Sequence, residues 1–297
     1  MNNYSTLGLS KLDHAATISQ NYATSDYRYT GVTPNNYITF NNEIWRIVGV
    51  FEVENAEGSK EKRVKIIRDE LIGEYSWDTS ESGINNGYGI NSWNQADLMT
   101  LLNSGAYYNR TSGTCYNGPN NRTTACDFGT NGLTSDAKNL ISDTKWYTGG
   151  SPTDNYKMTA EEHYSSERGT NLKGCSSGTD CNDTVTRETT WTGKIGLIYL
   201  SDYGYAATSD CYNTNIYDYD SSCKNKNWLF NSAYQWSFSP YVDSAMSYRV
   251  LFVNPSGYIY VDRASSTPGV RPVTYLKSEV MLTSGTGTRA NPYQITL

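Results

Sequence analysis

The side chains best suited to chemistry gather near the carboxyl end of the chain, in residues 235–276. Two strand-like runs, residues 248–253 and 258–262, flank an Asn-Pro-Ser-Gly sequence at 254–257 that suits a type I turn, so the segment predicts a β-hairpin. Tyrosine, serine, aspartate, asparagine and arginine crowd this hairpin and its flanks. Rigid aromatic rings combined with short hydrogen-bonding side chains are typical of adaptable recognition surfaces. The segment therefore predicts binding rather than catalysis.

Tyrosine is the most unusual feature of the composition, with 26 residues against 6 phenylalanines in a chain of 297. A buried hydroxyl needs a hydrogen-bond partner, so rings that served only to fill a core would include more phenylalanine. The excess predicts that many tyrosine rings lie at the surface. The alternative is a β-rich core that uses tyrosine for its strand propensity.

Catalytic chemistry has few candidate residues. His14 and His163 are the only histidines, so a Ser-His-Asp triad would need one of them, and neither belongs to an HExxH zinc motif. Each is therefore expected on a solvated surface. Glycine-rich phosphate-binding motifs are absent, and Asp218 with Asp220 lacks the spacing of a calcium loop. We predict no enzyme, no cofactor and no metal site, while a glycan-acting enzyme with paired carboxylates stays an alternative.

The charge balance excludes one large class of partners. The formal net charge is −6 at pH 7, and the one basic cluster, residues 60–65, is short and interrupted by Glu61. Proteins that bind phosphate backbones do so through strongly basic faces. The sequence therefore predicts no nucleic-acid partner.

The six cysteines occur as three close pairs: Cys115 and Cys126, Cys175 and Cys181, and Cys211 and Cys223. Their spacings do not match zinc-binding patterns, and each intervening segment is rich in loop-forming residues. Six cysteines allow fifteen pairings, of which we predict the nearest-neighbour one, with each disulfide stapling a long loop. Disulfides form in oxidising compartments, so the protein is expected to be extracellular. Residues 1–21 lack a signal-peptide pattern, so the export or anchoring segment is expected to be absent from this chain, unless the cysteines are reduced.

The predicted strands cluster towards both ends of the chain, with predicted helices between them. Strands are expected at residues 37–40, 43–53, 63–68, 192–200, 248–253, 258–262 and 270–276. Helices are expected at residues 5–20, 94–103, 135–146 and 158–168. Asn94 and Ser135 are the expected N-caps of the two main ones, 94–103 and 135–146. This order predicts an α+β fold with an antiparallel sheet, two main helices and long disulfide-stapled loops.

Four segments together resemble a known family: YRYTGVTPNNYITFNNEIWRIVGVF (27–51), KIGLIYLSDYGYA (194–206), WLFNSAYQWSFSPY (228–241) and GVRPVTYLKSEVMLTSGTGTRANPYQI (269–295). They are similar to exported proteins of Gram-positive bacteria, some of which carry pilin-like leader helices. The C-terminal region resembles the C-type-lectin fold shared with formylglycine-generating-enzyme-like domains. The same fold hosts variable proteins that are diversified by retroelements.

The resemblance implies one C-type-lectin-like domain over residues 27–297, an N-terminal helix or linker remnant over 1–26, and a variable-type, ligand-facing region over 236–276. Trp236 and Arg271 would brace that region. The EPN, QPD and WND signatures of calcium-dependent sugar-binding lectins are absent, and the region holds no cysteine, so neither calcium-mediated sugar binding nor formylglycine chemistry is expected. The exposed, ligand-binding positions would be Tyr241, Asp243, Ser244, Ser247, Tyr248, Asn254, Tyr258, Tyr260, Asp262 and Arg263.

These expectations combine into one leading hypothesis and two alternatives. The leading hypothesis is a bacterial cell-surface module that presents a Tyr/Ser/Asp-rich face to a protein or glycan ligand on another cell or host surface. The resemblance adds retroelement diversification of that face. One alternative is a structural subunit that self-assembles into a pilin-like surface filament. The other is the glycan-acting enzyme.

Overall fold

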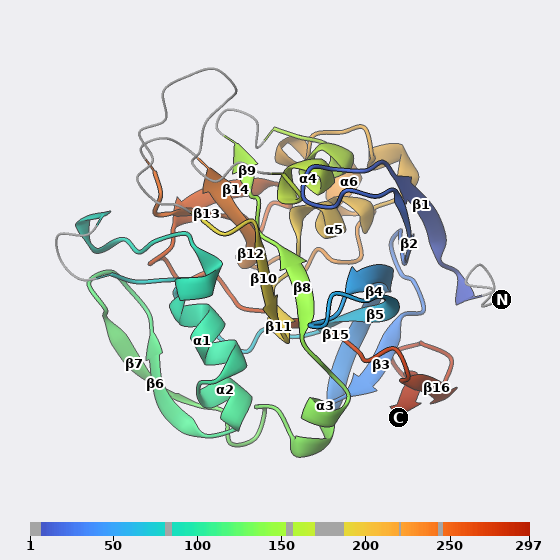
Figure 1. Cartoon of the computed structure of the whole chain (residues 1–297), viewed down its shortest axis with the longest axis horizontal. Helices are drawn as coiled ribbons and strands as arrows, with labels where there is room; N and C mark the ends of the chain where they lie inside the picture. The colour runs from blue at the N-terminus through green and yellow to red at the C-terminus, as the bar shows by residue number, and fades with distance from the viewer. Residues whose placement is uncertain (1–6, 81–84, 153–156, 170–186, 220, 243–245) are drawn as a thin grey trace.

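The computed structural model describes residues 7–80, 85–152, 157–169, 187–219, 221–242 and 246–297. These residues form a mixed α+β structure with mostly antiparallel sheets and short helices, which confirms the predicted class (Figure 1). Buried side chains from both larger sheets belong to one hydrophobic cluster. Among the described residues, none of the helices combines the length and the apolar character needed to cross a bilayer.

The larger sheet forms around the long strand β4 (Glu43–Glu54). Its strands run in the order β1 (Ser10–His14), β2 (Thr24–Arg28), β4, β5 (Lys60–Arg68), β15 (Val273–Tyr275) and β11 (Ile195–Gly196), with β3 (Tyr37–Phe40) also paired to β4. Residues 45–51 of β4 are all buried, as their apolar composition predicts. Asn41 and Asn42 have φ angles of 58° and 60°, and positive φ at both positions is typical of a type I′ turn. Strands β3 and β4 are therefore joined by a tight two-residue turn.

The second sheet contains the carboxyl-terminal hairpin. Its strands run in the order β14 (Ile259–Arg263), β13 (Arg249–Val253), β12 (Gln235–Val242) and β9 (Ser151–Pro152), and only β9 is parallel to its neighbour. In the turn between β13 and β14, the Gly257 N–H donates to the Asn254 carbonyl at 2.9 Å. Gly257 has a φ of 96°, a conformation that glycine adopts without strain. The hairpin prediction is confirmed.

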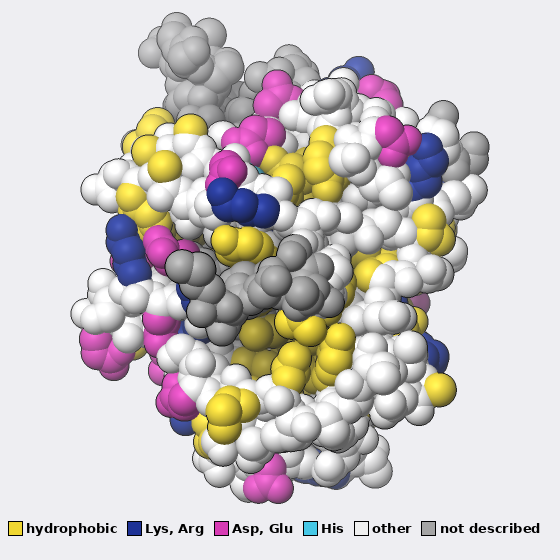
Figure 2. Space-filling view, turned by 90° about the vertical axis from the view of Figure 1, so that its right-hand side faces the viewer, with side chains coloured by type: hydrophobic (Ala, Val, Ile, Leu, Met, Phe, Trp, Pro, Cys, Tyr) yellow, Lys and Arg dark blue, Asp and Glu magenta, His cyan; other side chains and the backbone are white. Residues whose placement is uncertain are grey.

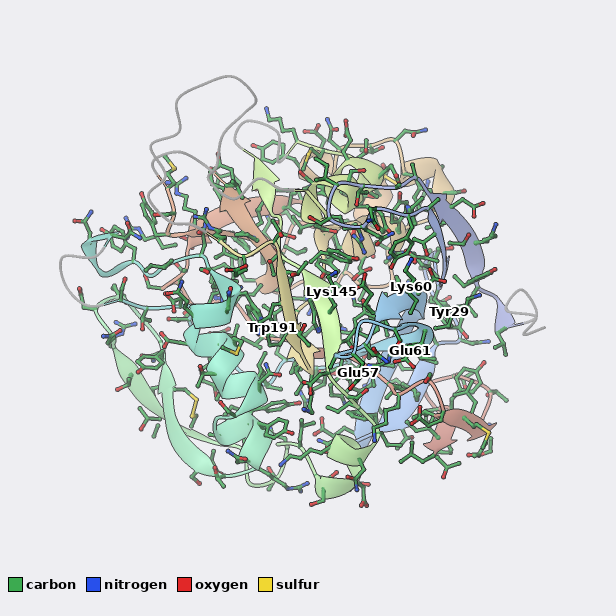
Figure 3. All side chains as sticks on the ribbon, in the orientation of Figure 1. Tyr29, Glu57, Lys60, Glu61, Lys145 and Trp191 are labelled. Atoms are coloured by element: carbon green, nitrogen blue, oxygen red, sulfur yellow. A yellow bond between two sulfur atoms is a disulfide. The ribbon has the colours of Figure 1, made fainter. Side chains whose placement is uncertain are left out.

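The remaining elements are short. Three two-stranded sheets pair β8 (Thr144–Tyr147) with β10 (Thr190–Gly193), β6 (Ser112–Tyr116) with β7 (Thr123–Asp127), and β16 (Met281–Ser284) with β17 (Gln294–Thr296). The α-helices are α1 (Asp97–Asn103), α2 (Ala106–Asn109), α3 (Ser135–Asn139), α4 (Ala160–Glu167), α5 (Leu200–Tyr205) and α6 (Ser221–Lys224). Trp191 of β10 has its ring 5.9 Å from that of Trp93 and 6.4 Å from that of Trp146, and so joins β10 to the core (Figure 3).

Strand pairing overrides several predicted elements. The helix expected at residues 5–20 is wrong, because residues 10–14 pair with β2 as strand β1. Strand β2 spans residue 26 and pairs with β4, so the sheet continues across the expected boundary between residues 26 and 27. The helix expected at 135–146 ends at Asn139, because residues 144–147 pair with β10. The strand expected at 192–200 divides into the end of β10, β11 and the start of α5.

The helices expected near residues 94–103 and 158–168 are confirmed, with shifted starts. Helix α1 begins after Ala96 rather than after Asn94. Helix α3 is capped by Thr134 rather than Ser135, since the Thr134 hydroxyl accepts the Ala137 N–H at 3.1 Å. Helix α4 begins with a reciprocal capping box between Thr159 and Glu162. Each start thus lies within a few residues of the predicted one.

Two of the three predicted disulfides are present: Cys115–Cys126, which links β6 to β7, and Cys211–Cys223, which links a 3₁₀ turn to α6. Their Cα atoms lie 5.9 Å and 5.8 Å apart. Cys175 and Cys181 lie outside the described residues. The two disulfides are consistent with an extracellular or otherwise oxidising environment.

Both histidines are buried, which corrects the expectation that they lie on solvated surfaces. His14 is 3% exposed, because the pairing of β1 with β2 places its ring 3.7 Å from that of Tyr164 in a stacked arrangement. Its Nε2 lies 3.1 Å from Asp26 and its Nδ1 lies 3.0 Å from Glu161. His163 lies on the buried side of α4. The N-terminal strands are thus attached to α4 through the buried His14 ring, which stacks on Tyr164 and contacts the exposed Glu161.

Most described tyrosines are buried or half-buried, which corrects the inference drawn from their excess over phenylalanine. Their hydroxyls find partners inside the protein. The Tyr203 hydroxyl donates to the Gly257 carbonyl at 2.6 Å, and the Tyr219 hydroxyl donates to the Gly204 carbonyl at 3.1 Å. The exposed rings in the described part of the chain are Tyr116, Tyr234 and Tyr260.

Candidate ligand-binding site

The carboxyl-terminal hairpin turns one face outward at the edge of the second sheet. Along β14, Ile259 and Val261 are buried, whereas Tyr260 between them is 45% exposed. Asp262 is half-buried and Arg263, at the end of the strand, is exposed. This alternation is what a strand with one solvated face requires. Tyr260 and Asp262 therefore share the outward face.

The ten positions expected to bind a ligand divide into three groups. Tyr260 and Arg263 are exposed, and Tyr248, Tyr258 and Asp262 are half-buried. Asp243 and Ser244 lie outside the described residues. Tyr241, Ser247 and Asn254 are buried, so the expectation that they are exposed is wrong.

The three buried positions belong to the scaffold. The Tyr241 ring lies in the core cluster, and its carbonyl accepts from Asn91 Nδ2 at 2.8 Å. The Ser247 carbonyl accepts the backbone N–H of the same Asn91, also at 2.8 Å. Asn254 Oδ1 accepts the Ser256 N–H at 2.8 Å, so this side chain stabilises the hairpin turn. The two backbone carbonyls and the Asn254 side chain therefore form hydrogen bonds inside the protein rather than with a ligand.

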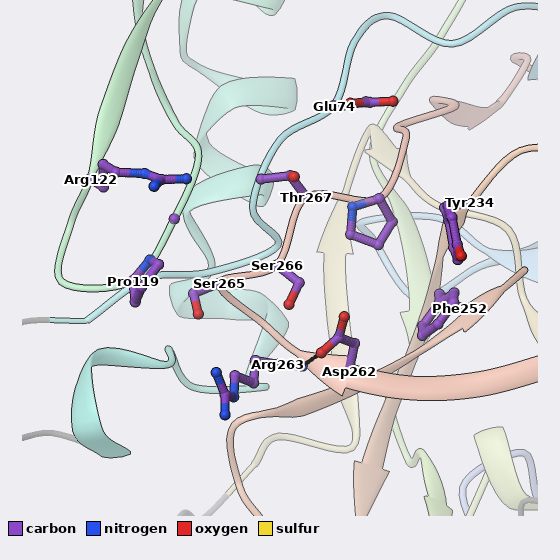
Figure 4. A pocket seen from close by; sticks show the side chains of 12 residues that line it. Glu74, Pro119, Arg122, Tyr234, Phe252, Asp262, Arg263, Ser265, Ser266 and Thr267 are labelled. Atoms are coloured by element: carbon purple, nitrogen blue, oxygen red, sulfur yellow. Dashed lines mark hydrogen bonds between the residues drawn. The ribbon is translucent and has the colours of Figure 1, made fainter.

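A groove of about 570 Å³ lies beside the outward face of the hairpin (Figure 4). Its walls come from β13 and β14, from the segments that precede β12 and follow β14, and from the turn between β6 and β7. Asp262 and Arg263 are the two expected binding residues that line it. The full lining is Glu74, Gly118, Pro119, Arg122, Tyr234, Phe252, Asp262, Arg263, Ser265, Ser266, Thr267 and Pro268.

One end of this groove is aromatic. Tyr234 is 56% exposed, and its ring centroid lies 5.8 Å from that of Phe252 (Figure 4). Phe252 in turn lies 6.4 Å from Tyr260, its cross-strand neighbour on β14. Tyr260 is stacked against Tyr217 at 6.4 Å. The result is a row of rings in which Tyr234 and Tyr260 are open to solvent.

The other end of the groove is basic, and neighbouring groups hold its guanidinium groups in place. The Arg263 guanidinium lies 3.8 Å from the centroid of the Tyr88 ring, a cation–π contact. Arg122 donates two hydrogen bonds, of 2.5 Å and 3.1 Å, to the carbonyl of Asn117 in its own hairpin. Figure 4 places Arg122 and Pro119 opposite Tyr234 and Phe252. A ligand would meet cations at one end and aromatic rings at the other.

Trp236 and Arg271 occupy the bracing positions expected of them. Trp236 is fully buried, and its Nε1 donates to the Tyr75 carbonyl at 2.9 Å. Arg271 is also buried and donates to the Arg68 carbonyl at 2.8 Å and to Gln235 Oε1 at 3.2 Å. Burial lowers the pKa of Arg271 to about 10, so the side chain stays charged at neutral pH. These bonds fix the start of β12, which comes directly after Tyr234 in the sequence.

The aliphatic hydroxyl side chains of the groove, Ser265, Ser266 and Thr267, have no histidine beside them in the lining. The lining contains neither histidine nor cysteine, and its carboxylates are Glu74 and Asp262. Asp78 and Asp97 lie outside that lining; burial raises the pKa of Asp78 to about 7, and it also raises the pKa of Asp97. Asp78 accepts the Ile90 N–H at 2.6 Å, which orders the backbone around it. Within the described ranges, no three His, Cys, Asp or Glu side chains are grouped so that they could hold a metal ion.

Sequence reasoning misses several residues of this face, among them Tyr88, Arg122 and Tyr234. Tyr234 directly precedes the β12 sequence QWSFSP, so its proximity to the ligand-facing region is a signal that the sequence contains. Tyr88 and Arg122 come from distant parts of the chain. Only the folded arrangement brings them beside β14.

Comparisons with known proteins do not identify the chain. No protein-family model, no curated protein and no solved structure matches it. The geometry of the groove is therefore the basis for a functional proposal.

Proposed function

We propose that this chain is an extracellular ligand-binding module of a bacterial cell surface and that the groove beside β14 takes the ligand. The observation that carries the proposal is that two exposed rings, Tyr234 and Tyr260, lie beside a groove whose lining carries charges of both signs. Aromatic rings supply contact area at low entropic cost, and charges supply orientation and specificity. Strands β13 and β14 and a disulfide-linked hairpin build part of the walls, which reduces the ordering needed on binding.

The ligand is proposed to be a protein or a glycan on another cell or on a host surface. Hydroxyl, carboxylate, guanidinium and aromatic groups all line the groove, and both classes of ligand offer partners for them. The cell-surface location and the C-type-lectin-like fold are supported by the sequence resemblance alone. No observation favours the filament, because the N-terminal helix that motivated it is replaced by β1. None favours the glycan-acting enzyme either.

Substitution of the two exposed rings tests the proposal. A Tyr234→Ala, Tyr260→Ala double variant is expected to bind about 10- to 100-fold more weakly, as for the loss of two aromatic contact residues. Its melting temperature should stay close to that of the wild type, because both rings are exposed and neither belongs to the buried core. Ligands captured on glycan and peptide arrays would be titrated by biolayer interferometry. Tyr116→Ala, an exposed tyrosine outside the groove, is the matched control, and equal binding by all three proteins would refute the proposal.

Retroelement diversification of this face is proposed on the resemblance, and the structure restricts where it can act. Outward positions such as Tyr260, Asp262 and Arg263 can change without altering the buried core. Tyr241 and Asn254 are expected to stay constant, because one lies in the core and the other holds the hairpin turn. Sequencing the segment that encodes residues 236–276 in related strains checks this pattern. Substitutions spread equally over buried and outward positions would contradict it.

A further inference from the structure

The hairpin β16–β17 forms an unprotected edge away from the groove. Backbone hydrogen bonds attach it to β3: the Tyr293 N–H donates to the Tyr37 carbonyl at 2.9 Å, and the Thr39 N–H donates to the Tyr293 carbonyl at 2.9 Å. In the part of the chain that the structure describes, β17 is the strand paired with β16, and no other strand joins it. The opposite side of β16 is therefore an open strand edge, which can pair with another chain.

This edge is also apolar and solvated. All four residues of β16 are exposed, with Met281 at 59% and Leu282 at 41%. Leu297, just after β17, is 52% exposed. Figure 2 views the molecule from the side on which β16 lies in Figure 1. Three of the nine large hydrophobic residues that are exposed in the described structure thus belong to one short hairpin, and such a concentration marks an interaction surface.

The charge pattern separates β16 from β1 and β14, which are outer strands of the two larger sheets. Strand β1 carries Lys11 and Asp13, and β14 carries Asp262 and Arg263. Charged side chains on an edge are a common device against strand-to-strand association. Residues 280–288, which include all of β16, contain no charged side chain. The device is therefore present on β1 and β14 and missing on β16.

We propose that β16 pairs in antiparallel fashion with β16 of a second copy of this chain, around a two-fold axis. An isologous contact of this kind requires a self-complementary surface. An uncharged strand meets that requirement, because self-pairing brings no like charges opposite one another. The pairing also brings Met281 and Leu282 of one copy against the apolar side chains of the other. A charged peptide would find no complementary charge on residues 280–288, and so the second copy is the favoured occupant.

The proposed dimer is weak, and salt strengthens it. Strand β16 has four residues, and the shift in its register with β17 between Leu282 and Ser284 shortens the regular edge further. An interface of this length falls below the size of stable, specific interfaces. Each copy carries a net charge of −6, so two copies repel at long range until salt screens them. Association through oppositely charged surfaces would show the reverse dependence on salt.

Sedimentation velocity on the full chain tests the proposal, at protein concentrations from about 5 µM to about 1 mM, the range in which small interfaces assemble. The wild type should shift from monomer to dimer as concentration rises, and more readily at high salt. Met281→Lys should weaken dimerisation at least about tenfold, because each copy would then bring a lysine without an opposite charge into the apolar contact. Ile18→Lys adds the same charge at a position 70% exposed elsewhere and should leave dimerisation unchanged. A wild type that stays monomeric throughout, or equal dimerisation by Met281→Lys, overturns the proposal.

Cross-linking gives a second, independent readout. A Thr283→Cys variant should form disulfide-linked dimers under mild oxidation, because a two-fold axis at β16 brings equivalent positions together. Thr33→Cys places a thiol at another exposed threonine and should stay monomeric. Equal cross-linking of both variants would mean random collision and would contradict the pairing. Ligand binding by the groove does not depend on either result, because β16 contributes none of the residues that line it.

Discussion

Asp202→Asn is expected to lower the free energy of unfolding by about 3–5 kcal/mol, the usual cost of removing one partner from a buried ion pair. Asp202 is buried; it accepts from Arg28 Nη1 at 2.5 Å and from the Lys65 ammonium. Burial opposes ionisation of this carboxyl, but Lys65 and Arg28 outweigh that effect and hold the pKa of Asp202 below its usual range. Arg28 would keep its 2.7 Å bond to Asp26. Lys65, fully buried, would lose its carboxylate partner.

Urea unfolding at pH 7 measures this effect. Asp210→Asn is the matched control, since Asp210 pairs with Lys226 on the surface, where ion pairs contribute little to stability. The Asp202 variant should unfold at a much lower urea concentration with the same slope, whereas the Asp210 variant should remain close to the wild type. Asp202 lies on α5, and its two cations lie on β2 and β5. Similar, small effects of both substitutions would mean that these buried contacts do not hold α5 to the larger sheet.

His14 is expected to make stability depend on pH. Its two ring nitrogens lie against Asp26 and Glu161, at 3.1 Å and 3.0 Å. Burial disfavours the charged imidazole, but these two carboxylates outweigh it and raise the pKa of His14 above its ordinary value of 6.5. Because the folded state holds the proton more tightly than the unfolded state, the contribution is complete below about pH 6.5. It is lost as the pH rises through the folded-state pKa.

The variant His14→Gln isolates this contribution. At pH 5.5 it should be less stable than the wild type by about 1–3 kcal/mol, the value of hydrogen bonds to charged groups. At pH 9 the difference should shrink, because the wild-type ring is then neutral. The other groups around the ring, Arg28, Tyr164 and Tyr205, all have raised pKa values and keep their protonation state from pH 5.5 to pH 9, so their contacts with the ring contribute equally at both pH values. A difference that stays constant from pH 5.5 to pH 9 would contradict the charged state assigned to His14.

The sequence predicts the parts of this fold that local signals determine. The hairpins β3–β4 and β13–β14 each combine residues typical of strands with residues that favour a tight turn. Both hairpins are present, with Asn41 and Asn42 in the first turn. The residues around His14 and Trp146 were expected in helices but lie in strands, because their pairing partners, β2 and β10, are distant or weakly marked in the sequence. Tertiary pairing decides between helix and strand there.

The candidate site was predictable in position but not in detail. The hairpin and its outward ring Tyr260 follow from period-2 alternation, which the sequence contains. Tyrosine composition could not separate exposed rings from buried ones, because buried hydroxyls such as that of Tyr203 find backbone acceptors that only the fold supplies. The groove itself needs Glu74, the β6–β7 turn and the segment before β12 to meet. A single sequence contains no pattern that predicts contact between residues so far apart in the chain.

Fluorine NMR of the protein labelled with 3-fluorotyrosine tests the central claim most directly, because it reports which rings a captured ligand touches. Signals would be assigned by single tyrosine-to-phenylalanine substitutions. Addition of a ligand found on the arrays should shift the Tyr234 and Tyr260 signals and leave the Tyr116 signal in place. Shifts confined to tyrosines away from the groove, with Tyr234 and Tyr260 unchanged at saturation, would contradict the proposed site.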